Sequence, residues 1–264
     1  MDISPVLVLM YHQIEPPDVT DGWLPNALAD TRYGVGLSNF QEQMEILQKR
    51  EIPVVGLGDC LDGTIAIRKP LSIVVTFDDG YASDLERAAP ILEDFGFPAT
   101  FFLATGHLGK KGMLTWDQAR DLSHNPLFEL GSHGVSHQFL SHLSTKDCEQ
   151  ELRDSFENLA DLSKLDRFSL SAPGGRTSLR VAQAAKEVGF LSLCTSRPGL
   201  FQDRNNRFSI PRLPIMKDMT PDCFQALIDP DSLSFHLNGW IRSSKNLVQT
   251  VLELPRTVFV RSGK

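Results

Sequence analysis

The residues of this chain that could perform chemistry are two acids and two histidines, and each pair follows an apolar segment. Asp78 and Asp79 come directly after the apolar run 72–77, and His133 and His137 follow about fifty residues later. A hydrolytic zinc site needs three protein ligands and an open position for water, whose pKa the metal lowers to roughly 7. Asp79, His133 and His137 supply that ligand count. The sequence therefore predicts a hydrolytic metal centre at the ends of strands.

Adjacent aspartates can share one site only where a strand has ended, because successive residues of a strand point to opposite faces. Gly80 permits the turn that this requires. Asp79 can then bind the metal while Asp78 stays free to take a proton from water. The two histidines are four residues apart, and the nearby Gly131 and Gly134 favour a loop over a helical turn.

Each motif also has an ordinary structural explanation. An Asp-Asp-Gly sequence is a common turn after a strand, and two histidines four residues apart arise by chance in many chains. Here both motifs follow apolar runs, in a chain that has seven histidines among 264 residues. That combination favours a metal site over coincidence.

The two motifs, in this order and at this spacing, resemble the first two signatures of the polysaccharide deacetylase family, also called carbohydrate esterase family four. The first signature is T-F-D-D-G, present at residues 76–80. The second is H-[ST]-x-x-H, and Gly134 stands here in place of the serine or threonine. The third, R-x-P-[YG]-G, aligns with residues 171–175, where Ser171 replaces the arginine. The resemblance covers roughly residues 5–215.

The resemblance implies a role for individual residues. Asp79, His133 and His137 would hold a divalent metal ion, with zinc as the default, although such a ligand set also accepts cobalt, nickel or iron. Asp78 would be the general base. The backbone N–H of Gly174 would donate to the oxyanion of the tetrahedral intermediate.

The signature arginine orients the free aspartate in the family, so its absence needs a replacement. Arg176 is one candidate, and a solvated side chain at the start of a helix is an equally good interpretation of it. Pro173 and the two glycines after it form a rigid turn that would face the substrate. Tyr11, Trp116, Pro173 and Arg176 are the predicted substrate contacts, although an aromatic residue near a helix start, such as Trp116, also fits a core position.

The general acid has two candidates. Residues 233–236, Leu-Ser-Phe-His, contain the leucine and histidine of a late family signature, but they lie in a segment with a helical pattern. His12 ends the apolar run 6–11 and resembles the L-x-Y-H start of the branch that acts on exopolysaccharides. A histidine at a strand end is commonly just a satisfied polar residue. The family context makes His12 the predicted acid.

Strand and helix patterns alternate along the chain, which is typical of an α/β barrel. Strands are expected at residues 6–11, 72–77, 99–103, 128–131, 168–171, 191–195 and 208–213. Helices are expected at 40–50 after a capping box of Ser38 and Gln41, at 82–95, at 116–122 after Thr115, at 145–162 capped by Thr145, and at 181–188. With the resemblance, this predicts an irregular (β/α) barrel of about seven parallel strands. Residues 1–264 would form one catalytic domain, with C-terminal helices from about residue 220.

Composition narrows the class of partner and the compartment. The formal charge of −7 argues against nucleic acid and anionic membrane surfaces, which need a basic patch. Four scattered cysteines without C-x-x-C spacing indicate reduced thiols. Asp2 and a short N-terminal apolar run do not fit a secretory signal, and no segment approaches a membrane span. These features predict a cytoplasmic protein, with the inner face of the membrane as one location to test.

The sequence thus predicts a metal-dependent hydrolase that removes N-acetyl groups from amino sugars of a glycan, an exopolysaccharide or a lipid-linked precursor. Two alternatives stay open. The same site could hydrolyse another small amide, such as a formamido sugar or a cyclic amide. The missing arginine also allows a non-catalytic carbohydrate-binding barrel.

Overall fold

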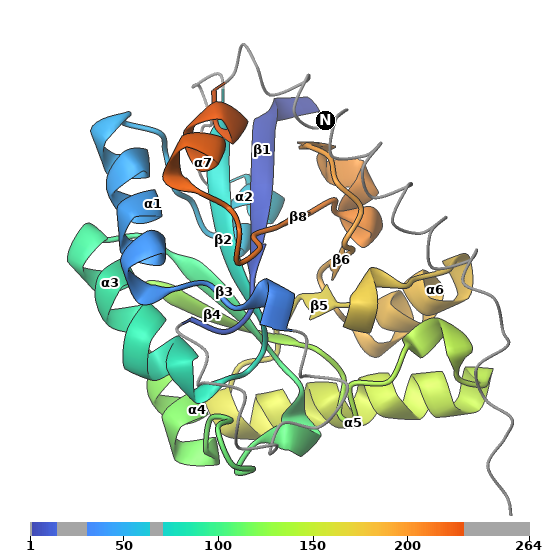
Figure 1. Cartoon of the computed structure of the whole chain (residues 1–264). Helices are drawn as coiled ribbons and strands as arrows, with labels where there is room; N and C mark the ends of the chain where they lie inside the picture. The colour runs from blue at the N-terminus through green and yellow to red at the C-terminus, as the bar shows by residue number, and fades with distance from the viewer. Residues whose placement is uncertain (1, 15–30, 64–70, 230–264) are drawn as a thin grey trace, which may run out of the picture.

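The fold is built on one sheet of mostly parallel strands (Figure 1). The computed structural model describes residues 2–14, 31–63 and 71–229. The hydrogen-bonded order is β6-β5-β4-β3-β2-β1-β7, and β8 also pairs with β1. The strands are β1 (Asp2–Tyr11), β2 (Ser72–Asp79), β3 (Ala99–Leu103), β4 (Phe128–Ser132), β5 (Leu170–Ser171), β6 (Leu193–Cys194), β7 (Phe201–Asp203) and β8 (Leu213–Pro214).

Strand direction confirms the predicted architecture. Every neighbouring pair in the sheet is parallel except β1 with β7, which is antiparallel. The mixed α/β fold with a parallel sheet is therefore confirmed, while the short antiparallel β7 was not predicted. The ladder does not close continuously into a ring. An isolated bridge between Cys194 and Ile210 joins β6 to the segment that leads into β8.

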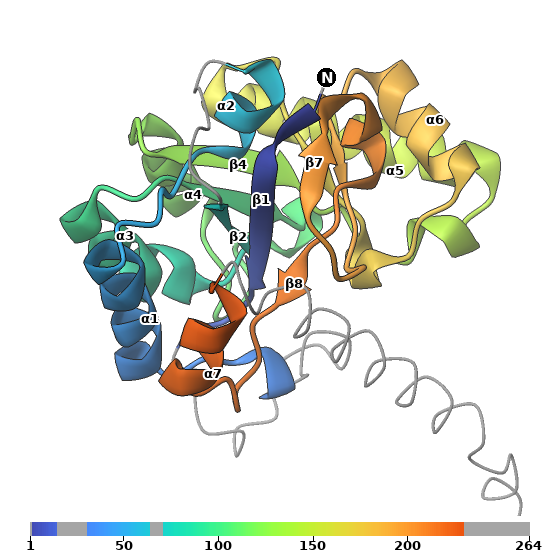
Figure 2. The same ribbon diagram turned by 90° about the horizontal axis from the view of Figure 1, so that it is seen from above.

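Helices surround the sheet, as the two views in Figures 1 and 2 show. Helix α1 packs on α3 and α7, and α5 packs on both α4 and α6. The helices are α1 (Leu37–Lys49), α2 (Leu57–Asp62), α3 (Ala89–Phe95), α4 (Trp116–His124), α5 (Thr145–Ser163), α6 (Leu179–Val188) and α7 (Pro221–Leu227). A π-helical turn, Asp84–Ala88, leads into α3, so the helical segment spans the predicted residues 82–95.

Local sequence signals located several elements correctly. Strand β3 has the predicted bounds, and α4 begins after Thr115, which forms a capping box with Gln118. Helix α6 ends at Gly189, whose φ of 111° is in the left-handed region that favours glycine. Two caps were wrong. The capping box at Ser38 does not exist, because α1 begins at Leu37 behind Gly36 and Ser38 lies inside the helix. Ser144, rather than Thr145, caps α5.

Strand β2 carries both aspartates at its C-terminal end. All eight of its residues are buried between β1 and β3, which explains its nearly continuous apolar sequence. The strand extends through Asp79, two residues past the predicted end. The chain then turns sharply, since φ is 82° at Asp79 and 84° at Gly80.

The C-terminal part is described as far as residue 229, where α7 packs against α1. The predicted helices beyond α7, and the Leu-Ser-Phe-His sequence at 233–236, lie outside the described residues. Within residues 2–14, 31–63 and 71–229, no helix combines the length and apolar character needed to cross a membrane.

Candidate metal centre

The three predicted ligands come together at the carboxyl ends of β2 and β4. Asp79 ends β2, His133 follows the last residue of β4, and His137 lies in the loop after it. Asp79 pairs with Leu103 of β3, and Leu103 pairs with Ser132 of β4, so the register brings the strand ends level. One possible ligand atom from each of the three lies within 4.8 Å of the others. This edge of a parallel barrel is where active sites form.

The atoms that converge all carry lone pairs. Nε2 of His133 lies 3.5 Å from Oδ1 of Asp79, and Nε2 of His137 lies 3.1 Å from the same oxygen. No well-directed hydrogen bond reaches this buried Oδ1. Lone pairs that face one another repel unless a proton or a cation lies between them. Imidazole and carboxylate ligands suit zinc and related divalent ions, so the donor set fits a metal ion.

A backbone contact determines which nitrogen of His133 is free. Its Nδ1 lies 2.9 Å from the carbonyl oxygen of Ser171, where it donates as N–H. That tautomer leaves the lone pair on Nε2, on the side of Asp79. Metal-binding histidines commonly fix their second nitrogen in this way. Burial lowers the pKa of His133 to about 4, although the charge of Asp78 opposes the shift, so the imidazole is neutral at neutral pH.

The site opens to solvent beside His137, whose side chain is 11% exposed, whereas that of His133 is 2% exposed. Burial acts to lower the pKa of His137, but the neighbouring carboxylate of Asp79, followed by the charge of Asp78, raises it. Burial acts to raise the pKa of Asp79, and the histidines around it lower that pKa overall. The histidines therefore stabilise the ionised, ligand form of Asp79, whereas Asp79 favours a proton on His137, which a metal ion would have to displace.

Two ligands have strained backbones. Asp79 has φ 82° and His137 has φ 58°, a region that residues other than glycine rarely adopt. The described part of the chain has two more such residues, Glu51 and Lys164, and both lie at helix ends. The strain costs about 1–2 kcal/mol per residue and persists where the surroundings enforce it, mainly at functional sites.

Asp78 is held by an arginine that the sequence analysis did not identify. Arg212 precedes β8 and has no solvent exposure. Its Nη1 and Nη2 donate to the two carboxylate oxygens of Asp78 at 2.7 Å each. The guanidinium also donates to the hydroxyl of Ser171 at 2.8 Å and to the carbonyl of Thr195 at 3.1 Å. The arginine missing from the third signature is thus replaced from a segment 41 residues further along the chain.

The residue at the signature position also contributes. The Ser171 hydroxyl donates to Oδ2 of Asp78 at 3.0 Å, between the carboxylate and Arg212. Burial would raise the pKa of Asp78, but the charge of Arg212, with help from His133, holds it well below its usual value. Asp78 is therefore an ionised, buried and oriented carboxylate beside the ligand cluster.

One signal in the sequence could have revealed Arg212. It is the single charged residue in the apolar stretch 208–216, which includes the predicted strand 208–213. A lone cation in a buried strand must be paired, because an unpaired buried charge is very costly. The structure contradicts the suggestion that Arg176 fills this role. Its guanidinium instead lies 4.5 Å from the centre of the exposed Phe139 ring, and its Nη1 is 3.4 Å from Nε2 of His142.

The prediction that Tyr11 contacts substrate is wrong. Its side chain is fully buried, donates its hydroxyl to Oε1 of Gln43 at 2.7 Å and stacks on Phe77. Residues of a strand alternate between two faces, and Tyr11 points to the helix side. Its neighbour His12 is half-buried, with its ring 4.6 Å from that of Tyr33. The charge of His12 lowers the pKa of both Asp78 and Asp79, which places it close to the site.

The third signature forms the turn that follows β5. Pro173 is buried, while Gly174 is exposed with φ 62°. A Cβ on Gly174 would meet Phe139 at 2.4 Å, so the exposed ring packs directly over this backbone. Trp116, the first residue of α4, is 39% exposed. The roles assigned to Gly174, Pro173 and Trp116 stay predictions.

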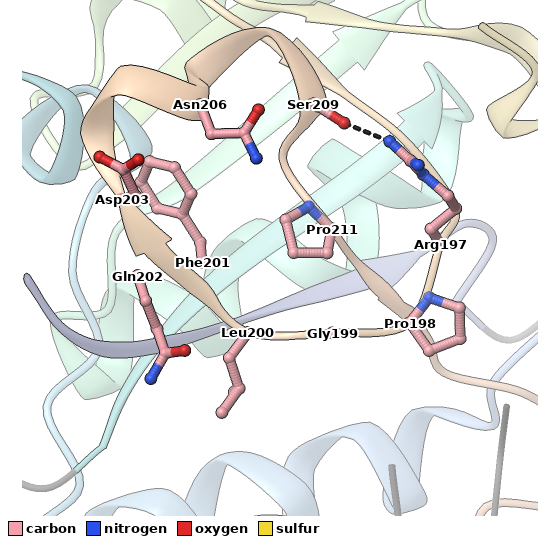
Figure 3. A pocket seen from close by; sticks show the side chains of 10 residues that line it. All are labelled: Arg197, Pro198, Gly199, Leu200, Phe201, Gln202, Asp203, Asn206, Ser209 and Pro211. Atoms are coloured by element: carbon pink, nitrogen blue, oxygen red, sulfur yellow. Dashed lines mark hydrogen bonds between the residues drawn. The ribbon is translucent and has the colours of Figure 1, made fainter. Parts of the chain in front are cut away.

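A third histidine borders the cluster. His107 lies in the loop after β3, is 8% exposed, and has its ring centre 6.2 Å from that of His137. Burial, followed by the charge of Lys110, lowers its pKa. A cavity of about 400 Å³ is lined by residues of β7 and of the segments that precede and follow it along the chain (Figure 3). Its lining comes from residues 197–211, so it is distinct from the ligand cluster.

A protein-family model supports the signatures independently. The model described as polysaccharide deacetylase matches residues 67–192, which include the two aspartates, the two histidines and the third signature. This part of the chain matches the polysaccharide deacetylase family. Arg212 and His12 lie outside the residues that this model matches, and the N-terminal L-x-Y-H sequence remains a prediction.

Relatives of the chain include proteins named as deacetylases. The chain is 26% identical over 157 residues to the putative polysaccharide deacetylase YxkH of Bacillus subtilis, covering 60% of this chain and 56% of that protein. It is 23% identical over 243 residues to a poly-beta-1,6-N-acetyl-D-glucosamine N-deacetylase of Staphylococcus aureus, covering 84% and 81% of the two chains.

Two solved structures share the fold. The Streptococcus pyogenes deacetylase PplD, in complex with acetate, superposes with a TM-score of 0.74 at 22% identity, over 86% of this chain and 99% of that one. IcaB from Ammonifex degensii superposes with a TM-score of 0.73 at 21% identity, over 84% and 98%.

Proposed function

We propose that this protein is a metal-dependent hydrolase that removes N-acetyl groups from the amino sugars of a glycan. The observation that carries the proposal is that two adjacent aspartates at the end of β2 have different partners. Asp79 lies with His133 and His137 in a cluster of possible metal ligands, while Asp78 is kept ionised by the buried Arg212. The family match and the names of the relatives support the reaction class.

The chain's own groups divide the work of amide hydrolysis. Asp78 accepts a proton from the attacking water, and Arg212 with Ser171 keeps its carboxylate in one orientation. The N–H of Gly174 donates to the carbonyl oxygen as negative charge develops there. His12 delivers a proton to the leaving nitrogen, so the C–N bond breaks to yield acetate and a free amine. A divalent ion held by the ligand cluster would polarise the carbonyl and lower the pKa of water.

The substrate is an amino-sugar glycan, either as a polymer or as a lipid-linked precursor. Exposed aromatic surface at Phe139 and Trp116, with Arg176 beside the former, can contact sugars that neighbour the reacting one. A cytoplasmic location remains a prediction. Acetate release measured across polymeric, lipid-linked and formamido substrates would identify the preferred class.

The decisive experiment removes one ligand. Asp79→Ala should lower metal content and abolish acetate release from an N-acetylhexosamine oligomer, while Asp117→Ala, at a carboxylate that is 88% exposed, should leave both unchanged. A mutant of Asp79 that keeps both metal and activity would refute the proposal.

A second substitution separates ligand from base. Asp78→Asn should retain metal but lose turnover by roughly 10² to 10⁴, since it removes the proton acceptor. Turnover equal to that of the unmodified protein would exclude Asp78 as the base.

A further inference from the structure

Helix α5 carries a polar stripe that reaches the loop bearing His137. Glu151 projects one oxygen, Oε1, into the loop and accepts three hydrogen bonds there. The donors are the N–H of Val135 at 2.8 Å, the N–H of Ser136 at 2.6 Å and the hydroxyl of Ser136 at 2.8 Å. Hydrogen bonds to a carboxylate are stronger than those between neutral groups. The residue directly before His137 is therefore fixed through both its backbone and its side chain.

The next turn of α5 holds the start of the same loop. Ser155 is fully buried, and its hydroxyl is 2.8 Å from that of Ser132 at the end of β4. The Ser132 hydroxyl in turn accepts the N–H of Gly134 at 3.0 Å. Residues four apart lie on one face of a helix, so Glu151 and Ser155 act from the same side. Glu151 accepts the N–H groups of residues 135 and 136, and Ser155 bonds the Ser132 hydroxyl that accepts the N–H of Gly134.

Two carbonyl groups of the loop accept hydrogen bonds from the segment that follows β3. The N–H of Thr105 donates to the carbonyl of Gly134 at 3.0 Å, and the N–H of Gly106 donates to that of Val135 at 2.9 Å. Asn158 of α5 donates to the hydroxyl of Thr105 at 3.0 Å, which ties this second loop to the same helix. In the loop between the two histidine ligands, backbone N–H groups and backbone carbonyl groups are therefore both hydrogen-bonded to fixed partners.

This arrangement explains why Gly134 departs from the family signature. Gly134 has φ 76°, and a Cβ there would lie 3.1 Å from Oε1 of Glu151. A serine or threonine would therefore be strained and would crowd the carboxylate.

We propose that Glu151 is a positioning residue for the metal centre, which enforces the strained backbone of His137 and so sets the metal affinity. The inference rests on the proposed function, because it assumes that Asp79, His133 and His137 bind a divalent ion. Residues that orient metal ligands from outside the coordination shell typically contribute about 10- to 100-fold in affinity.

The test measures metal binding itself, by titrating metal-free protein with Zn²⁺ against a chromophoric chelator. Glu151→Ala should weaken binding by about 10- to 100-fold. Glu151→Gln keeps an acceptor oxygen at the same reach and should restore affinity to within about threefold, since only the charge assistance is lost. Glu157→Ala, an exposed glutamate on the same helix, is the matched control and should not change affinity.

A readout of geometry complements affinity. The visible absorption of Co²⁺-loaded protein reports coordination, and Glu151→Ala should change the spectrum while Glu157→Ala should not. If Glu151→Ala does not fold, Glu151→Asp takes its place, because the shorter side chain keeps the charge but loses the reach. Glu151→Asp should then bind Zn²⁺ at least about threefold more weakly than Glu151→Gln.

Failure of this inference is distinguishable from failure of the proposed function. If the unmodified protein does not bind Zn²⁺, or Asp79→Ala binds it as tightly, the metal centre itself is refuted. If the unmodified protein binds through Asp79 but Glu151→Ala and Glu151→Asp both bind within twofold of it, only the positioning role is overturned.

Discussion

The two sides of the candidate site are held by different physical means. On the base side, Asp78 is paired with Arg212 in a fully buried ion pair that reaches across the sheet. On the ligand side, the loop before His137 is held by Glu151, a half-buried carboxylate on an outer helix. Arg212 stands in for the signature arginine that this chain lacks.

The difference concerns what is lost when the partner is removed. Without Arg212, Asp78 would be a buried charge without a counter-ion, so the whole fold would be destabilised. Without Glu151, the loop would lose hydrogen bonds at a position that solvent can reach. We therefore expect the base side to govern stability and the ligand side to govern metal binding.

The largest expected effect would test the base side. Arg212→Leu should lower the free energy of unfolding by about 3–5 kcal/mol, because it leaves the buried carboxylate of Asp78 without a counter-ion. The double variant Asp78→Asn with Arg212→Leu should recover part of that loss, and chemical denaturation measures both. Arg176→Ala is the control and should change stability by less than about 0.5 kcal/mol. Equal effects of the two arginine substitutions would contradict the assigned role of Arg212.

A pH titration of metal-free protein tests His133, which touches both sides. Its pKa is lowered by burial to about 4 from an unfolded value near 6.5. The unfolded chain therefore takes up this proton first as the pH falls. The contribution of neutral, buried His133 to the free energy of unfolding should be fully present above about pH 6.5. It should be lost as the pH falls toward 4, which lowers the free energy of unfolding by on the order of 3 kcal/mol. His133→Asn should flatten this part of the profile, and an unchanged slope would show that His133 is not the group responsible.

The smallest expected effect compares two glycines. Gly134→Ala should cost about 2 kcal/mol and Gly109→Ala about 1 kcal/mol, since both have positive φ but only the former would crowd a neighbour. The respective φ values are 76° and 80°, and nothing lies within 4 Å of a Cβ on Gly109. Thermal unfolding and Zn²⁺ titration measure the outcome. If both variants lose equal stability and equal Zn²⁺ affinity, the side chain of Glu151 moves aside without cost. That result would weaken the contrast between the base side and the ligand side.

Sequence patterns predicted the parts of the site whose residues lie close together along the chain. Asp79, His133 and His137 were predicted from spacing and apolar context, and β3 and α4 from burial and capping signals. Arg212 and Glu151 were not predicted, because their contacts depend on how distant segments pack. Asp78 and Arg212 are separated by 134 positions, and no local pattern encodes that pairing.

Errors in the prediction have similar physical causes. Tyr11 was predicted to contact substrate, yet its side chain packs against Gln43 and Phe40 of α1. The cap of α1 was misplaced because a serine near a helix start is a common signal, while here the backbone at Gly36 is already extended. Antiparallel β7 is three residues long, too short for a periodic pattern to reveal.

The position of Arg212 limits how far the protein can be shortened. A fragment cut to residues 67–192 would retain the first three signatures, yet it would lack the cation that neutralises Asp78 and the two strands, β1 and β8, that pair beside it. Such a fragment should express poorly and aggregate. Boundaries for expression or for grafting this site onto another scaffold must therefore include the first strand and extend past Ile215.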